Sequence, residues 1–219
     1  MLDTRFPRPL GDLGNPASWS IPVESLVVDG IGPRDAVQTA GGLLSGRVLP
    51  AFQVAARELE RRGVSAITTS CGFLVLLQSE LQAAVGIPVV TSSLLQLPAL
   101  LESEDQVGVL TISAERLGTD YLRQAGVPEN RLADVLVQGV APQSNFCRAI
   151  LGNEPAMDVG QAGRDVVGAA IRLRERAPQL RTLVLECTNM PPYAEAIRAA
   201  TGWRVFSLLD STVLQRAAA

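Results

Sequence analysis

The chain has 219 residues, of which 47% are hydrophobic and 19% charged, a balance typical of a globular protein with a sizeable core. Its formal net charge of −3 is spread without long runs of either sign, which argues against nucleic acid as a partner. No apolar stretch approaches the roughly 20 residues of a transmembrane helix, so we expect no membrane partner either.

The first residues, Met1 to Pro7, lack the basic and then apolar pattern of a signal peptide. The chain contains three cysteines, an odd number that suits neither a disulfide framework nor a zinc site. We therefore predict a cytoplasmic protein with free thiols and no bound metal.

Short apolar runs and helical patterns alternate along the chain, which predicts an α/β protein with a parallel sheet covered on both faces. The predicted strands cover residues 25–30, 64–68, 88–91, 106–113, 135–138, 182–186 and 204–208. The predicted helices cover residues 48–62, 73–85, 114–124, 158–176 and 191–200.

The second half of this pattern repeats the first in the order of its elements. The second half opens with the strand 106–113, whereas the first opens with residues 2–5, which resemble the loop after such a strand. Either the first half has lost its opening strand or the natural chain begins further upstream; we favour the upstream start.

Two cysteines occupy matching positions in the two halves, Cys71 and Cys187, each after a predicted strand and before a predicted helix. Parallel α/β proteins carry their chemistry at such junctions. The chain has no histidine, so a thiol pair is the leading candidate for acid and base catalysis. A cysteine alone is more often a buried small hydrophobic residue, as we expect of Cys147, but the pairing favours catalysis.

Three blocks, in the correct order, resemble the aspartate/glutamate racemase superfamily: residues 2–15, 69–73 and 186–191. The resemblance implies two pseudo-symmetric three-layer α/β domains with mainly parallel sheets and an active site in the cleft between them. One domain would hold residues 1–95 and 204–219, and the other residues 96–203. The resemblance also implies one catalytic cysteine from each domain, no cofactor, and compatibility with a homodimer.

Racemisation of an α-carbon needs a base on one face and an acid on the other, which a thiolate and a thiol can supply. We expect the partial positive charge of a helix N-terminus to bias one thiol towards thiolate. Glu186 either tunes Cys187 or is a solvated or paired carboxylate. Arg5 and Arg8 could bind a distal carboxylate, although we expect Arg8 on the surface.

Further candidates to bind substrate come from the cysteine blocks, from the resemblance and from symmetry. Asp3 and Thr4 correspond to a substrate-contacting pair in glutamate racemases or form a simple turn, and Asn15 either belongs to this site or only turns the backbone. Ser113 holds the place in the second half that Thr4 holds in the first. The candidates nearest the cysteines are Ser70, Gly72, Phe73, Thr188 and Asn189.

The expected function is a cofactor-independent racemase of an amino acid or related compound of aspartate, glutamate or hydantoin type, with a small molecule as its partner. Glutamate racemases carry a histidine where this chain has Asn189, which argues against a close glutamate racemase. The alternatives are a maleate-type cis-trans isomerase, a malonate-type decarboxylase, or a non-catalytic ligand-binding protein. Retention of both cysteines favours racemisation over decarboxylation, which needs only one thiol.

Overall fold

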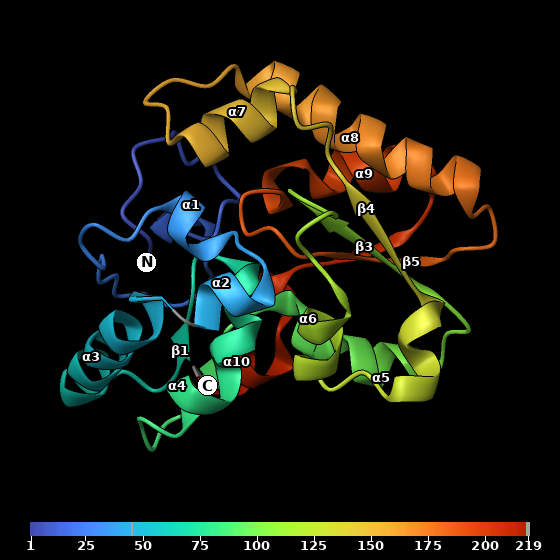
Figure 1. Cartoon of the computed structure of the whole chain (residues 1–219). Coiled ribbons are helices and arrows are strands. Elements are labelled where there is room, and N and C mark those ends of the chain that lie inside the picture. The colour runs from blue at the N-terminus through green and yellow to red at the C-terminus, as the bar shows by residue number, and fades with distance from the viewer. Residues whose placement is uncertain (45, 218–219) are drawn as a thin grey trace.

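The computed structural model describes residues 1–44 and 46–217 and forms two parallel sheets (Figure 1). The first sheet pairs β1 (Ile67–Thr68) with β2 (Val89–Val90). The second sheet has the strand order β4-β3-β5-β6. The α/β class with parallel sheets, predicted from the alternation of strands and helices, is confirmed.

The second sheet is built from β3 (Val107–Thr111), β4 (Val135–Gly139), β5 (Thr182–Leu185) and β6 (Arg204–Phe206). Every residue of β3 and β5 is buried, as expected for central strands covered on both faces. Leu110 on β3 is paired with Leu185 on β5.

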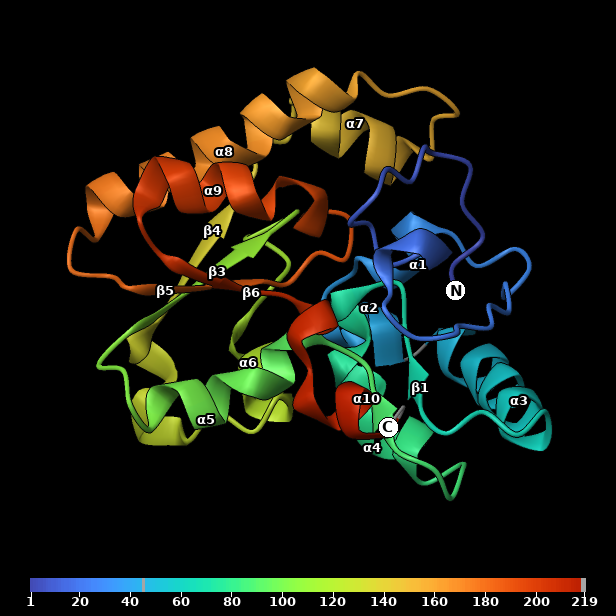
Figure 2. The same cartoon turned by 180° about the vertical axis from the view of Figure 1, so that it is seen from behind.

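Helices cover both faces of this sheet (Figures 1 and 2). The long helix α8 (Val159–Arg176) and α9 (Ala194–Thr201) lie over one face, and α5 (Leu97–Leu101) and α6 (Thr119–Gln124) lie over the other. The helix α7 (Asn145–Gly152) packs against α8 and against α1 (Pro33–Ala36), and so joins the two halves.

The first half contains shorter elements around β1 and β2. After β1 the chain enters the 3-10 helix η2 (Gly72–Leu77), which leads into α4 (Gln78–Gln82). The other helices are α2 (Ala40–Leu44), α3 (Val48–Arg61) and α10 (Thr212–Ala217), and the other 3-10 segments are η1 (Pro16–Ser18), η3 (Ser93–Gln96), η4 (Glu129–Asp134), η5 (Pro191–Tyr193) and η6 (Leu208–Asp210).

Several predicted elements are shorter than expected, among them the strands predicted at 64–68 and 88–91, of which only the two-residue β1 and β2 form. The strand predicted at residues 25–30 is reduced to one parallel bridge between Val28 and Leu2, because only a short N-terminal segment runs beside it. The helix predicted at 73–85 begins as the 3-10 helix η2. Of the helix predicted at 114–124, only α6 forms, because the chain turns at residues 113–118 and Gly118 caps the helix.

The C-terminal segment contacts both halves. Residues 204–206, which the sequence analysis groups with the first half, pair with β5 in the second sheet. After β6 the chain returns to the first half, where Leu208 and Leu214 pack with Leu13 and Val90.

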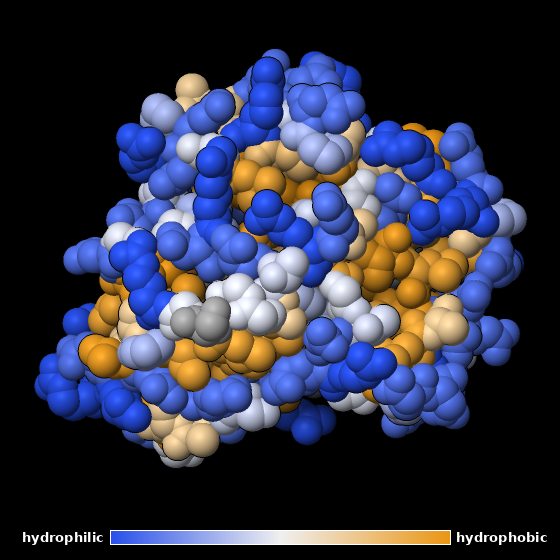
Figure 3. Space-filling model, viewed as in Figure 1, coloured by the Kyte–Doolittle hydropathy of each residue, from blue (hydrophilic) through white to orange (hydrophobic). Residues whose placement is uncertain are grey.

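The face drawn in Figure 3 mixes hydrophilic residues with several hydrophobic areas, one below α7 and a broad one at the right, where the strands of the second sheet lie. Within residues 1–44 and 46–217, no helix combines the length and the apolar character that crossing a membrane would need.

The central position of β3 gives a stability prediction. Leu110 is fully buried, whereas Leu136 on the neighbouring strand β4 is only half-buried. We expect Leu110→Ala to lower the free energy of unfolding by about 2–5 kcal/mol, through lost burial and the cavity left behind. The matched variant Leu136→Ala should cost less. Urea denaturation of both variants measures the difference, and equal losses would contradict the packing described.

Candidate active site

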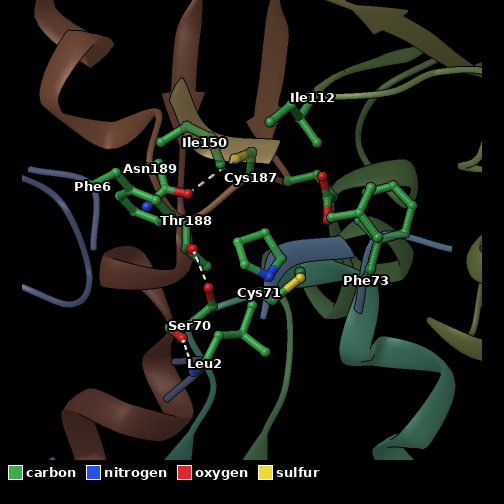
Figure 4. A pocket seen from close by; sticks show the side chains of 14 residues that line it. Leu2, Phe6, Ser70, Cys71, Phe73, Ile112, Ile150, Cys187, Thr188 and Asn189 are labelled. Carbon is green, nitrogen blue, oxygen red and sulfur yellow. Dashed lines mark hydrogen bonds between the residues drawn. The ribbon is translucent and has the colours of Figure 1, made fainter. Parts of the chain in front are cut away.

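A narrow pocket lies where the chain leaves β1 in one sheet and β5 in the other (Figure 4). Its cavity volume is about 20 Å³ in the conformation described. The sulfur atoms of Cys71 and Cys187 lie near its centre, with Phe6 and Phe73 on either side. The residues that line it are Leu2, Phe6, Pro33, Val37, Ser70, Cys71, Gly72, Phe73, Ile112, Ile150, Glu186, Cys187, Thr188 and Asn189.

Cys71 stands at the start of η2 with an extended backbone (φ −157°, ψ 117°). Its side chain is buried, and the backbone N–H groups of Phe73 and Leu74 interact with its sulfur. The peptide N–H of Leu74 also donates to the carbonyl of Cys71 at 3.1 Å. The tight turn therefore holds the thiol against the first turn of a 3-10 helix.

Cys187 follows β5 by two residues. The backbone N–H of Glu186 donates to the carbonyl of Leu110 at 2.9 Å, which extends the β5 pairing to the edge of the pocket. Met190 then donates to the carbonyl of Cys187 at 3.1 Å and closes a turn. The Cys187 thiol donates to Oδ1 of Asn189, with sulfur and oxygen 3.7 Å apart.

Hydrogen bonds between the two halves hold the two cysteine segments together. The Thr188 hydroxyl donates to the carbonyl of Ser70 at 2.7 Å (Figure 4). The Ser93 hydroxyl donates to the carbonyl of Leu185, the last residue of β5, at 2.7 Å. These two bonds tie the first half to the segment that carries Cys187. Within the first half, the Ser70 hydroxyl oxygen accepts from the backbone N–H of Leu2 at 2.9 Å.

A buried carboxylate that the sequence analysis did not single out orients Asn189. Asp12 is 1% exposed, and its Oδ2 accepts from Nδ2 of Asn189 at 2.7 Å. The expectation of a surface Arg8 is wrong: its side chain is 13% exposed and forms an ion pair with Asp12 at 2.6 Å. Asp12 therefore orients the Asn189 amide, whose Oδ1 accepts from the Cys187 thiol. Its place in the block of residues 2–15 was the available sequence signal.

Glu186 is the second buried carboxyl group at the site, at 1% exposure. Its Oε2 accepts from the Thr111 hydroxyl at 2.7 Å, while Oε1 has no hydrogen-bond partner within the described part of the chain. One oxygen of the Glu186 carboxyl group is thus hydrogen-bonded and the other is not. In the sequence, the sign of this site was a charged residue at the end of an apolar run.

Burial dominates the electrostatics of the pocket. It raises the pKa of the Cys71 thiol to about 12, and the charge of Glu186 adds to this rise. The pKa of Cys187 is also raised, first by burial and then by Glu186. The backbone N–H groups at the helix start have the expected direction of effect on the thiol pKa but do not set the net shift. They lower the pKa of each thiol, but burial and Glu186 outweigh them.

Seven of the eleven predicted site residues line the pocket and four do not. Those that line it are Ser70, Cys71, Gly72, Phe73, Cys187, Thr188 and Asn189. The other four hold the surrounding backbone or neighbouring side chains. Asp3 accepts from the N–H of Gly30, Thr4 accepts from Arg8, Asn15 caps η1, and Ser113 begins the turn before α6. Cys147 lies buried in α7, outside the pocket lining.

Gly72 provides a test of how tightly the two halves meet. A Cβ at this position would overlap the backbone carbonyl and Oε1 of Glu186. We expect Gly72→Ala to destabilise the fold by about 1–3 kcal/mol, because the Glu186 backbone must shift. Gly118→Ala is the matched control, since a Cβ there meets no atom within 4 Å. Thermal unfolding compares the two variants; a neutral Gly72→Ala would contradict this close approach.

The buried Glu186 predicts a pH dependence of stability. Burial raises its pKa to about 8, above the ordinary value of 4.5 that we assign to the unfolded chain. The folded state therefore holds this proton more tightly, so stability is greatest below pH 4.5 and falls as pH rises to about 8. The loss is on the order of a few kcal/mol.

Denaturant titrations between pH 5 and pH 8.5 measure this slope. Glu186→Gln should flatten it, because the variant has no carboxyl group to ionise. The control Glu129→Gln removes an exposed carboxyl whose pKa is lowered by Arg123, and should leave the slope unchanged. A slope that survives in Glu186→Gln would assign the effect to other groups.

Comparison with known proteins places this geometry in a family. Residues 45–215 match the family model described as Asp/Glu/Hydantoin racemase. The dimethylsulfoniopropionate lyase of Durusdinium sp. clade D is 30% identical over 217 residues, which cover 96% of this chain and 70% of the relative. Dimethylsulfoniopropionate lyase 7 of Emiliania huxleyi (strain CCMP1516) is 28% identical over 223 residues.

The chain spans 63% of the length of the Emiliania huxleyi relative. Among solved structures, a glycine-to-cysteine mutant of arylmalonate decarboxylase has a TM-score of 0.60 at 17% identity and covers 96% of this chain and 90% of its own. That likeness extends the family match from sequence to fold. The chain belongs to the Asp/Glu/hydantoin racemase family.

Proposed function

We propose that the protein is a cofactor-independent carbon-acid enzyme that eliminates dialkyl sulfide from a sulfoniopropionate. The observation that carries the proposal is the presence of two thiols, Cys71 and Cys187, in the lining of one buried pocket. A thiolate in such a pocket can remove a proton from the carbon next to a carboxylate. The likeness to dimethylsulfoniopropionate lyases over 96% of the chain supports elimination as the outcome.

The elimination balances with one base and no cofactor. A cysteine thiolate takes the proton next to the carboxylate, and the released electron pair forms the carbon–carbon double bond. The bond from the β-carbon to sulfur breaks, and its electron pair leaves with the sulfur as dimethyl sulfide. Acrylate is the second product, and the thiolate has become a thiol.

Polar groups beside the thiols suit the substrate carboxylate. The Ser70 oxygen accepts from the backbone N–H of Leu2, so its own hydrogen is available to a ligand. A hydrogen bond to the carboxylate stabilises the negative charge that develops there when the proton is removed. The Thr188 hydroxyl and the Asn189 amide already bind protein groups and position the segment.

A racemase of an amino acid or related compound is the second candidate. The pairing of two thiols, one from each half of the chain, favours it, because inversion needs an acid and a base on opposite faces. The first step is the same in both reactions: a substrate with a β-leaving group would eliminate, and one without it would be reprotonated by the second thiol. The finer division into two pseudo-symmetric lobes around the pocket is part of the same proposal, with β6 (Arg204–Phe206) in the sheet of the second lobe.

Single substitutions of the cysteines test the proposed elimination. The wild type should release dimethyl sulfide and acrylate from dimethylsulfoniopropionate, measured by gas chromatography. Because one base suffices, we expect different results for the two variants Cys71→Ser and Cys187→Ser. The variant that lacks the base should lose activity by about 10²–10⁴-fold, and the other should keep a measurable rate. Cys147→Ser is the matched control and should keep full activity. Absence of both products with the wild type, or full activity in both pocket variants, would refute the proposal.

The racemase candidate predicts a different result for the same variants. In heavy water, the wild type should exchange the α-proton of a substrate from a panel of amino acids and hydantoins, and inversion should require both thiols. Sulfide release without exchange or inversion across the panel would leave elimination as the function.

A further inference from the structure

The pocket gathers acidic groups without a cationic side chain. Cys71, Cys187 and Glu186 are buried together, and the rest of the lining is apolar or carries hydroxyl and amide groups. Among the described residues that line the pocket, none is lysine or arginine. Arg8, the nearby cation, is engaged by Asp12 and Thr4. A negative charge formed in this pocket therefore has no positive partner from its own lining.

Glu186 is held rigidly with one carboxylate oxygen unpaired. The Thr111 hydroxyl binds Oε2, and the backbone N–H binds the carbonyl of Leu110. Oε1 is buried and has no hydrogen-bond partner in the part of the chain that the structure describes. A buried carboxylate oxygen left unpaired costs free energy, which a cationic ligand offsets through its charge.

We propose that Glu186 is the counter-ion for an onium group of the substrate, so that the pocket selects small carboxylates that carry a sulfonium or quaternary ammonium centre. The inference rests on the proposed function, because the sulfonium substrate is the one that elimination requires. Onium methyl groups cannot donate conventional N–H or O–H hydrogen bonds, so a buried carboxylate and apolar walls suit them better than a hydrogen-bonding cage. Phe73 adds an aromatic ring to the same lining, and cations are attracted to such rings.

The same contact accounts for how Glu186 ionises in a pocket that disfavours charge. Burial raises the pKa of Glu186, and burial first and then Glu186 raise the pKa of both thiols. Tyr121 also senses this site: burial first, and then the charges of Cys71 and Glu186, raise its pKa. A bound cation favours the ionised carboxylate. Binding of the onium group therefore releases the Glu186 proton to solvent.

Binding of unreactive analogues tests the inference apart from catalysis. The probes are 3-(trimethylammonio)propionate and 4,4-dimethylpentanoate, which share a shape and a carboxylate but differ in that an uncharged carbon replaces the cationic nitrogen. Calorimetry with the wild type in two buffers of different ionisation enthalpy measures affinity and proton release together. We expect the onium probe to bind at least about tenfold more tightly, equal to about 1.4 kcal/mol, and to release protons, while 4,4-dimethylpentanoate releases none. Equal affinities, or no proton release with the onium probe, would overturn the inference.

Glu186→Gln should remove the preference for the onium probe while 4,4-dimethylpentanoate still binds, and should raise the KM for dimethylsulfoniopropionate. Glu129→Gln makes the same chemical change at an exposed carboxyl and should keep the preference. A Glu186→Gln protein that still prefers the onium probe would refute the role of this carboxylate. If this variant does not fold, the two wild-type measurements decide the question alone.

The outcomes separate this inference from the proposed function. An onium preference that depends on Glu186, without sulfide release, would support the cation site and refute the lyase. Sulfide release without such a preference would support the lyase and refute the cation site.

Discussion

The structure depends most on the burial of three acidic groups around one small pocket. Cys71, Cys187 and Glu186 lie within the same lining, and burial raises the pKa of each. This is the reverse of the usual way to activate a thiol, in which a neighbouring positive charge or a long helix lowers the pKa. The site is therefore stable with its protons on, and ionisation requires a positive charge from outside the lining.

The fold brings these groups together by the geometry of its parallel sheets. Cys71 follows β1 of the first sheet, and Glu186 and Cys187 follow β5 of the second, so the carboxyl ends of two strands meet at one point. Close contact is possible because Gly72 has no side chain where the backbone of Glu186 passes. The hydrogen bond from Thr188 to Ser70 then joins the two segments. Small changes at this contact act directly on the distance between the two thiols.

The sequence predicted the parts that depend on local pattern. Apolar runs located the strands of the second sheet within one to two residues, and paired junctions located both cysteines, because these features repeat at short range. It predicted less well the elements whose length depends on contacts with neighbouring segments. The strands β1 and β2 have two residues each, and the helix predicted at 114–124 begins only after Gly118. Asp12 and Arg8 were missed as a buried pair, since burial of a charge depends on contacts distant in sequence. Glu186 was predicted either to tune Cys187 or to be a solvated or paired carboxylate; its burial, which rules out the solvated state, depends on contacts with β3 and η2.

The positive sulfur of a sulfoniopropionate would contribute to the proposed reaction in two ways. It would pair with the buried Glu186 carboxylate, and it withdraws electrons and is a good leaving group, so the group that would be recognised is also the group that is eliminated. A pocket with a built-in lysine or arginine would instead form the thiolate at all times and expose a reactive sulfur to oxidants and other electrophiles. Within one family fold, a β-leaving group on the substrate can thus decide between elimination and return of the proton by the second thiol.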